Sequence, residues 1–278
     1  MTLSEVRDTI PNRREKDMLG QGWEHPEMHE LAIESSPKVL PRTAKYISLL
    51  SGFMSISAWR NRGIGSRMKI ELVDIGHEQR RAVEGFIHER FADKYGADVS
   101  HFMPHLLRLY TDAGETIAAA GYRPASDGRL FLETYLDKPV DQVLSDMYGH
   151  PVSRDAIVEV GNMADSHPGT GRAGITAWTA YLSGMGYTWC VFTGVKMLRN
   201  GFRRLGIETQ IICPADASRL DAEQRKRWGT YYETDPVVMS GNIMKGYWAL
   251  RFAREVLQPL WRVGLQEGKR HLREQRGR

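Results

Sequence analysis

The chain has 278 residues, enough for one large domain or two small ones. It is 41% hydrophobic and 26% charged, as soluble globular proteins are, and its net charge of +4 gives no indication of a nucleic-acid partner. The two cysteines, Cys190 and Cys213, lie in apolar runs, which excludes a disulfide framework and a cysteine-based zinc site, so we expect no metal. We see no secretory signal and no run of transmembrane length, so the expected location is the cytoplasm.

The first part of the chain, residues 1–66, is polar and rich in proline, which predicts an extension outside the main domain. One apolar island, Tyr46–Trp59, interrupts it and is flanked by basic residues. This island could pack on the main domain or lie on a membrane surface, and packing is the commoner outcome for such a segment.

Residues 67–243 show regular patterns that predict one folded domain. Alternating and helical patterns indicate, in chain order, a strand at Lys69–Asp74, a helix at His77–Tyr95, a hairpin of His105–Thr111 and Thr116–Arg123, a strand at Arg129–Leu136 and a short helix at Pro139–Met147. After the segment Ala156–Arg172 we expect a strand at Thr188–Thr193, a helix at Val195–Leu205, a strand at Ile207–Cys213 and a last hairpin within Tyr231–Ile243. This order predicts a mixed α/β (α+β) fold with one sheet and helices on its faces.

The segment Ala156–Arg172 reads as a strand, a glycine-containing loop and the start of a helix. The strand carries one acid, Glu159, among β-branched apolar residues. A loop of this kind can direct backbone N–H groups at an anion, so a reaction beside a bound phosphate is one interpretation. The other is a simple turn, with the acid on the solvent face of its strand.

The C-terminal segment, residues 244–278, is basic and carries an apolar stripe formed by Trp248, Phe252, Val256, Leu260 and Val263. Such a helix can lie on an anionic bilayer. The alternative is a terminal helix packed on the domain, which we favour for Trp248–Leu260.

Several motifs resemble known families. The layout resembles the GNAT acyltransferase fold and, more closely, its acyl-homoserine-lactone synthase branch, through Gly121-Tyr122-Arg123 and Glu159-Val160-Gly161-Asn162-Met163-Ala164. A closer resemblance is to the thermostable hemolysin family, through Phe102-x-Pro104, Leu130-Phe131-Leu132-Glu133-x-Tyr135-Leu136-Asp137, Val158-Glu159-Val160-Gly161-Asn162, Leu198-Arg199-Asn200-x-Phe202 and Trp228-Gly229-x-Tyr231-Tyr232. It runs from about Phe86 to Ile243 and implies a GNAT-like mixed sheet with helices on both faces.

The resemblance also implies roles for individual residues. The implied catalytic set is Glu159, Arg123, Glu133 and Asn162. Glu159 would be the general base, Arg123 would orient a substrate carboxylate or pair with an acid, and Glu133 is a second acid that could face the same pocket. The alternative for Glu159 is a structural carboxylate that holds a neighbouring arginine. Asn162 stands where the synthases have an arginine, which argues against homoserine-lactone chemistry. The implied acyl-donor site is Gly169, Thr170, Gly171, Arg172 and Thr193. The implied face for an acidic carrier protein is Lys196, Arg199, Arg203 and Arg204, and the alternative is that these four residues form a solvated helix face.

The implied function is N-acyl transfer. The acyl group would come from acyl carrier protein or acyl-CoA as co-substrate, with no bound cofactor, and would pass to an amine such as an amino acid. Pro168 lacks a backbone N–H in the donor loop, and this favours the carrier protein slightly over CoA. The alternative function is a non-catalytic hemolysin that acts on membranes. In either case a peripheral contact with the inner membrane face is a further expectation.

Overall fold

The structure is a computed structural model that describes residues 68–167, 170–250 and 254–277, without the side chains of 254–258. All of these residues belong to one compact unit, Thr43–Arg278. The N-terminal extension with its apolar island and Gly169 lie outside the described residues.

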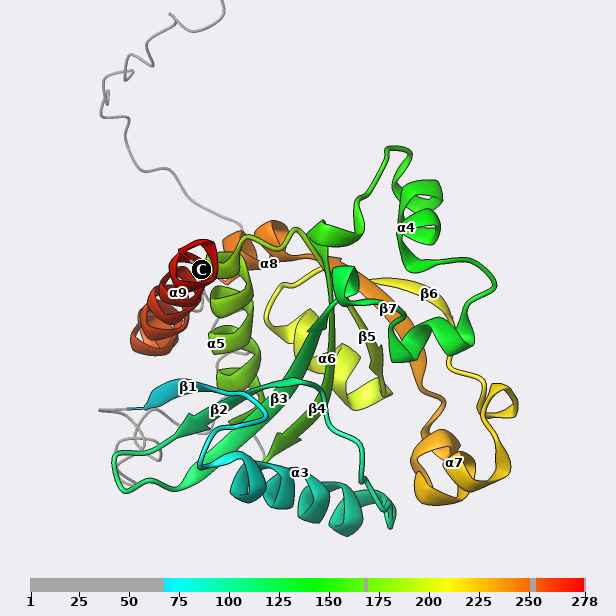
Figure 1. Cartoon of the computed structure of the whole chain (residues 1–278), viewed down its shortest axis with the longest axis horizontal. Helices are drawn as coiled ribbons and strands as arrows, with labels where there is room; N and C mark the ends of the chain where they lie inside the picture. The colour runs from blue at the N-terminus through cyan, green and yellow to red at the C-terminus, as the bar shows by residue number, and fades with distance from the viewer. Residues whose placement is uncertain (1–67, 168–169, 251–253, 278) are drawn as a thin grey trace, which may run out of the picture. The chain divides into compact units, whose positions relative to one another are not determined.

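The core of the fold is one mixed sheet with the strand order β1-β2-β3-β4-β5-β7-β6 (Figure 1). The strands are β1 (Lys69–Val73), β2 (His105–Tyr110), β3 (Thr116–Pro124), β4 (Ile157–Asp165), β5 (Trp189–Gly194), β6 (Gln210–Pro214) and β7 (Val237–Asn242). The β4–β5 pair is parallel, and the other neighbours are antiparallel.

Helices cover both faces of this sheet. They are α3 (Arg80–Tyr95), α4 (Val140–Tyr148), α5 (Thr170–Met185), α6 (Lys196–Arg204), α7 (Ala222–Arg227), α8 (Ile243–Ala249) and α9 (Arg254–Arg276). Alternate residues of β3 point to opposite faces, so Ala118 and Ala120 join the core that contains α5, and Ala119 joins the core beneath α3. This arrangement confirms the expected mixed sheet with helices on both faces.

The β2–β3 hairpin shows how local sequence sets the fold. Thr111 donates its backbone N–H to the carbonyl oxygen of Glu115 at 3.0 Å, which closes the predicted turn. Gly114 has φ 81°, a conformation that glycine adopts without steric cost. The turn therefore places the two strands side by side in antiparallel register.

Two predicted strand segments are wrong. Arg129–Leu136 contains a 3-10 helix, Phe131–Tyr135, because the side chain of Glu133 turns back and accepts the N–H of Leu130 at 2.7 Å. Tyr231–Ile243 is not a hairpin, since another 3-10 helix, Tyr231–Thr234, precedes β7. Strand β7 then runs between β5 and β6 and pairs with both.

Of the predicted C-terminal stripe, Phe252 and the side chain of Val256 lie outside the described residues. The favoured packing on the domain holds for Leu260 of α9 and is wrong for Trp248, which is exposed on α8. Helix α9 packs along α5, and Gly264 and Gly268 bring it against the backbone carbonyl groups of Ala177 and Tyr181. Leu260 is buried in this contact. No helix in the described part of the chain is long and apolar enough to span a bilayer.

Candidate functional site

The central parallel strands separate part of the way along the sheet. In the described part of the sheet, β4 pairs with β5 from Ile157 to Val160. The register between β3 and β4 then shifts by one residue, which marks a β-bulge on β4 before Ala164. Asn162 lies in this bulge with φ 50°, a left-handed conformation uncommon for residues other than glycine. Beyond it, β4 follows β3 while β5 runs toward α6 (Figure 1).

Glu159 lies on β4 just before the strands separate, and its side chain is only 3% exposed. Its two carboxylate oxygens accept the backbone N–H groups of Phe131 at 2.9 Å and Leu132 at 3.0 Å. Burial raises the pKa of Glu159 to about 7, although the two hydrogen bonds act against this shift. The site therefore holds a carboxyl group that can gain or lose a proton near neutral pH.

Arg123 is the residue of β3 that faces Glu159 in the sheet register. Its guanidinium donates to the carbonyl oxygen of Asp127 at 3.2 Å, and its charge lowers the pKa of Glu159. Arg123 is half-buried, so a cation beside this carboxyl group remains open to solvent. The two residues predicted to act together thus share one region of the sheet surface.

Glu133 has a different environment from the one expected. It accepts the N–H of Val140 at 2.8 Å and the guanidinium of Arg154 at 2.8 and 3.2 Å, in addition to the N–H of Leu130. Burial works to raise its pKa, but these hydrogen bonds keep it below its ordinary value. The carboxylate of the predicted second acid therefore joins η2 (Phe131–Tyr135), α4 and Arg154.

Asn162 also acts on the backbone. Its Oδ1 accepts the N–H of Met103 at 2.8 Å, so its side chain holds the segment before β2 and does not project into the site as expected. On the other side, Arg80 donates to the carbonyl oxygens of Met103 at 2.7 Å and Pro104 at 2.8 Å. Neither Arg80 nor Met103 was predicted as part of the site, although Met103 lies within the motif Phe102-x-Pro104, which could have located this segment.

The described part of the predicted donor loop lies at the start of α5. Thr170 is buried, and its hydroxyl donates to the carbonyl oxygen of His167 at 2.7 Å and accepts the N–H of His167 at 3.3 Å, so it ties the start of the helix to this residue. A Cβ atom added to Gly171 would come within 2.9 Å of the Asp165 carboxylate, which therefore lies against this helix start. Burial and the nearby charge of Arg204 lower the pKa of Arg172. The charge of Arg204 on α6 thus acts on Arg172 in the first turn of α5.

The remaining predicted residues lie on β5 and α6. Thr193 pairs with Val238 of β7, one residue beyond the last β4–β5 pair, and is half-buried. The predicted basic face is on α6, where Arg199 is half-buried and Lys196, Arg203 and Arg204 are exposed. In the part of the chain that the structure describes, no three His, Cys, Asp or Glu side chains gather as a metal site would require.

Comparison with known proteins identifies a family. Residues 73–247 match the family described as Thermostable hemolysin, which confirms the resemblance seen in the motifs. No curated protein matches the chain in sequence.

Similar solved structures include the acyl-homoserine-lactone synthase LasI, at 15% identity and TM-score 0.46, with 68% of this chain and 96% of that chain covered. BjaI, a CoA-dependent acyl-homoserine lactone synthase with SAM and isopentyl-CoA, is 10% identical with TM-score 0.48, and the match covers 69% of this chain and 90% of that chain. FeeM, an N-acyl amino acid synthase from uncultured soil microbes, is 13% identical with TM-score 0.42, and the match covers 68% of this chain and 98% of that chain.

Proposed function

Since this chain belongs to the thermostable hemolysin family, we propose that it is an N-acyltransferase. It moves a fatty acyl group from the thioester of acyl carrier protein or acyl-CoA to an amine such as an amino acid. The observation that carries this proposal is the buried carboxyl group of Glu159, whose pKa of about 7 suits a general base at neutral pH. It lies where β4 and β5 separate, which gives a thioester room to approach along unpaired strand edges.

In the proposed reaction the amine nitrogen attacks the thioester carbonyl carbon, and the Glu159 carboxylate takes the proton from that nitrogen. The tetrahedral intermediate then collapses, the carbon–sulfur bond breaks, and the thiolate leaves with a proton returned from Glu159. The products are an amide and a free thiol. The Phe131 and Leu132 N–H groups hold the carboxylate in one orientation throughout.

The charges around α5 and α6 support a phosphate-containing donor arm. Arg172 lies in the first turn of α5, where backbone N–H groups also attract anions, and Arg204 lies close to it. The exposed basic side chains of α6 add a surface that an acidic carrier protein could contact. We therefore favour acyl carrier protein as the donor, with acyl-CoA as the alternative.

We do not favour the alternative function, a non-catalytic hemolysin. Burying an ionisable carboxyl group costs stability, and a protein that only binds membranes gains nothing from doing so beside two separating strands. The test is whether purified protein with acyl carrier protein or CoA thioesters and an amine forms an amide by mass spectrometry. An extracted lipid that lyses cells supports the enzyme, whereas lysis that stays with the purified protein supports the alternative.

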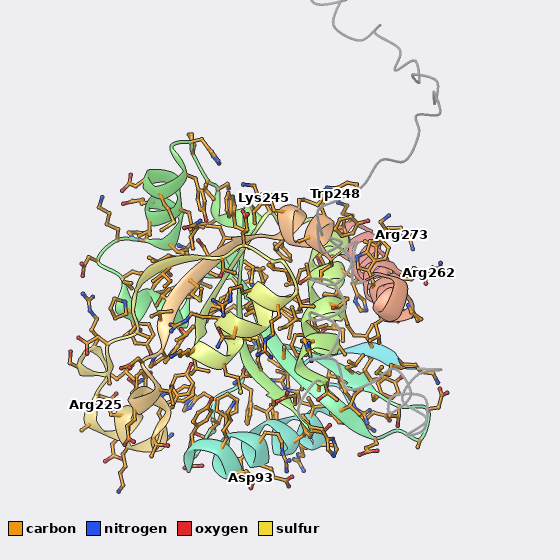
Figure 2. The ribbon with its side chains drawn as sticks, turned by 180° about the vertical axis from the view of Figure 1, so that it is seen from behind. Asp93, Arg225, Lys245, Trp248, Arg262 and Arg273 are labelled. Carbon is orange, nitrogen blue, oxygen red and sulfur yellow. The ribbon has the colours of Figure 1, made fainter. Side chains whose placement is uncertain are left out.

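We also propose a peripheral contact with the inner membrane face, where an amphiphilic product would partition. Met244 and Trp248 on α8 are 43% and 56% exposed, and Lys245 lies between them. Helix α9 contacts α8 through Trp261 and Tyr247, whose rings are 4.9 Å apart. Exposed arginines of α9 lie on the outer surface beyond this contact (Figure 2). Exposed apolar side chains flanked by cations favour an anionic bilayer.

A further inference from the structure

Two neighbouring residue pairs occupy one face of the β3–β4 ladder. Arg123 faces Glu159, and the next pair on the same face is Gly121 and Gly161. The first pair carries opposite charges and the second carries no side chains. Because residues two apart on a strand are about 7 Å apart, these pairs lie within the length of one small molecule.

The side chain of Met103 fills the space above the two glycines. A Cβ atom added to Gly121 would lie 2.5 Å from the Cβ of Met103 and 2.7 Å from its Cγ, and one added to Gly161 would lie 2.8 Å from its Cε. The methionine therefore occupies the volume that side chains from both strands would otherwise take. It belongs to neither strand and reaches this position from the segment before β2.

The backbone of Met103 is held by hydrogen bonds, and its side chain packs at the edge of the core beneath α3. Asn162 accepts its N–H and the buried Arg80 donates to its carbonyl oxygen, so both polar backbone groups are fixed by side chains of other elements. The side chain itself is only half-buried and is unbranched, a type that changes shape easily. The fold thus fixes where this residue stands and leaves its outer atoms adaptable.

We propose that the acceptor is a small α-amino acid, and that Met103 limits the size of the acceptor's side chain. The α-amino group lies at Glu159, the α-carboxylate pairs with Arg123, and the acceptor side chain points over Gly121 and Gly161, where it meets Met103. Glycine and alanine fit beside the methionine, and larger side chains do not. This inference rests on the proposed acyl transfer and adds the class of acceptor and the residue that limits it.

The experiment compares kcat/KM for glycine and leucine with one acyl donor. Met103→Ala removes three heavy atoms and should raise the leucine-to-glycine ratio at least tenfold, because a few methylene groups in a pocket are worth about that much. Met103→Leu preserves the volume and should keep the wild-type ratio. Met147→Ala, on the distant α4, controls for loss of an accessible methionine and should not change the ratio.

A double variant guards against a non-specific effect. In Met103→Ala the clash of a Gly161 methyl group with the Met103 Cε is gone, so Gly161→Ala added to it refills the space. It should reverse part of the gain for leucine. A ratio that stays at the wild-type value in Met103→Ala while acyl transfer continues overturns the inference and leaves the proposed function standing.

A binding measurement separates the two proposals fully. Calorimetric titration of the wild type and Met103→Ala with N-acetylglycine and N-acetylleucine does not require turnover. Stronger binding of the leucine compound by Met103→Ala alone supports the inference even where no acyl transfer is found. Equal binding of both compounds by both proteins overturns it.

Discussion

Glu159 and Arg123 face each other across β4 and β3, yet the carboxylate takes its hydrogen bonds from the backbone N–H groups of Phe131 and Leu132. The other buried acid, Glu133, is bound by the guanidinium of Arg154. A carboxylate held by neutral donors changes its protonation state more easily than one held by a cation. This difference is why we propose Glu159 as the base and Glu133 as a structural residue.

Glu159→Gln should lower acyl transfer by about two orders of magnitude, since a positioned general base contributes about that much. The amide nitrogen cannot accept a backbone N–H, so a loss of about 1 kcal/mol in the free energy of unfolding should accompany it. The measurements are turnover and urea unfolding at pH 7. Glu133→Gln is the matched control and should affect unfolding more than turnover. Unchanged turnover in Glu159→Gln would remove this residue from the mechanism.

The pH dependence follows from the pKa of Glu159, about 7 in the folded chain against an ordinary value of 4.5. Between these values the folded chain holds a proton that the unfolded chain has released. The contribution of this group to stability is therefore fully present below pH 4.5 and is lost as the pH rises through 7. Relative to Glu159→Gln, the wild type should lose roughly 1 to 3 kcal/mol of unfolding free energy over this range.

The acyl-transfer rate should rise with pH, whereas the contribution of Glu159 to stability falls, because the deprotonated carboxylate is the base. The acyl-transfer rate should fall below about pH 7 in the wild type, as general-base catalysis requires. In Glu159→Gln this fall of the rate at low pH should be absent. A fall of the rate below pH 7 that persists in the variant would assign the titration to another group.

Gly268→Ala should destabilise the fold by roughly 2 to 4 kcal/mol, because its new methyl group would meet the backbone carbonyl of Tyr181 and push α9 from α5. Gly277→Ala is the control, since its Cβ would lie 3.5 Å from the Arg273 carbonyl oxygen, an ordinary contact. Thermal unfolding measures both. Equal stability of the two variants would show that α9 does not need this close approach.

Charge reversal at Arg199 and Arg203 should reduce turnover with acyl carrier protein by tenfold or more and affect acyl-CoA little. Association of a basic face with an acidic partner is steered by charge and screened by salt. The measurement is the steady-state rate with each donor at low and high salt. If acyl-CoA is the better donor and the charge reversals lower the rates with both donors equally, the CoA alternative holds.

Membrane contact is tested best by point changes on α8. Truncation after Gly246 would also remove α9 and expose the buried face of α5. Trp248→Ala and Lys245→Glu should each weaken binding to vesicles that contain anionic lipid, because one removes apolar contact and the other adds repulsion. Met197→Ala, an exposed methionine of α6, is the control in a vesicle co-sedimentation measurement. Equal sedimentation of all variants would exclude α8 as the contact.

The amino-acid sequence by itself determined the order of most elements and the candidate base. The continuous apolar run in β3, the turn with Gly114 and the apolar run around Glu159 act over a few neighbours, so they can be read from local patterns. The family resemblance was carried by the same short motifs, such as Val158-Glu159-Val160-Gly161-Asn162.

Only the tertiary structure decided what the polar side chains do. Glu133, Asn162 and Arg80 find their partners at positions distant in the sequence or in an unpredicted 3-10 helix. The protonation of Glu159 likewise depends on burial beneath η2, which no strand pattern encodes. Local periodicity reports which face a residue occupies, whereas hydrogen-bond partners and desolvation arise from segments that meet only when the chain folds.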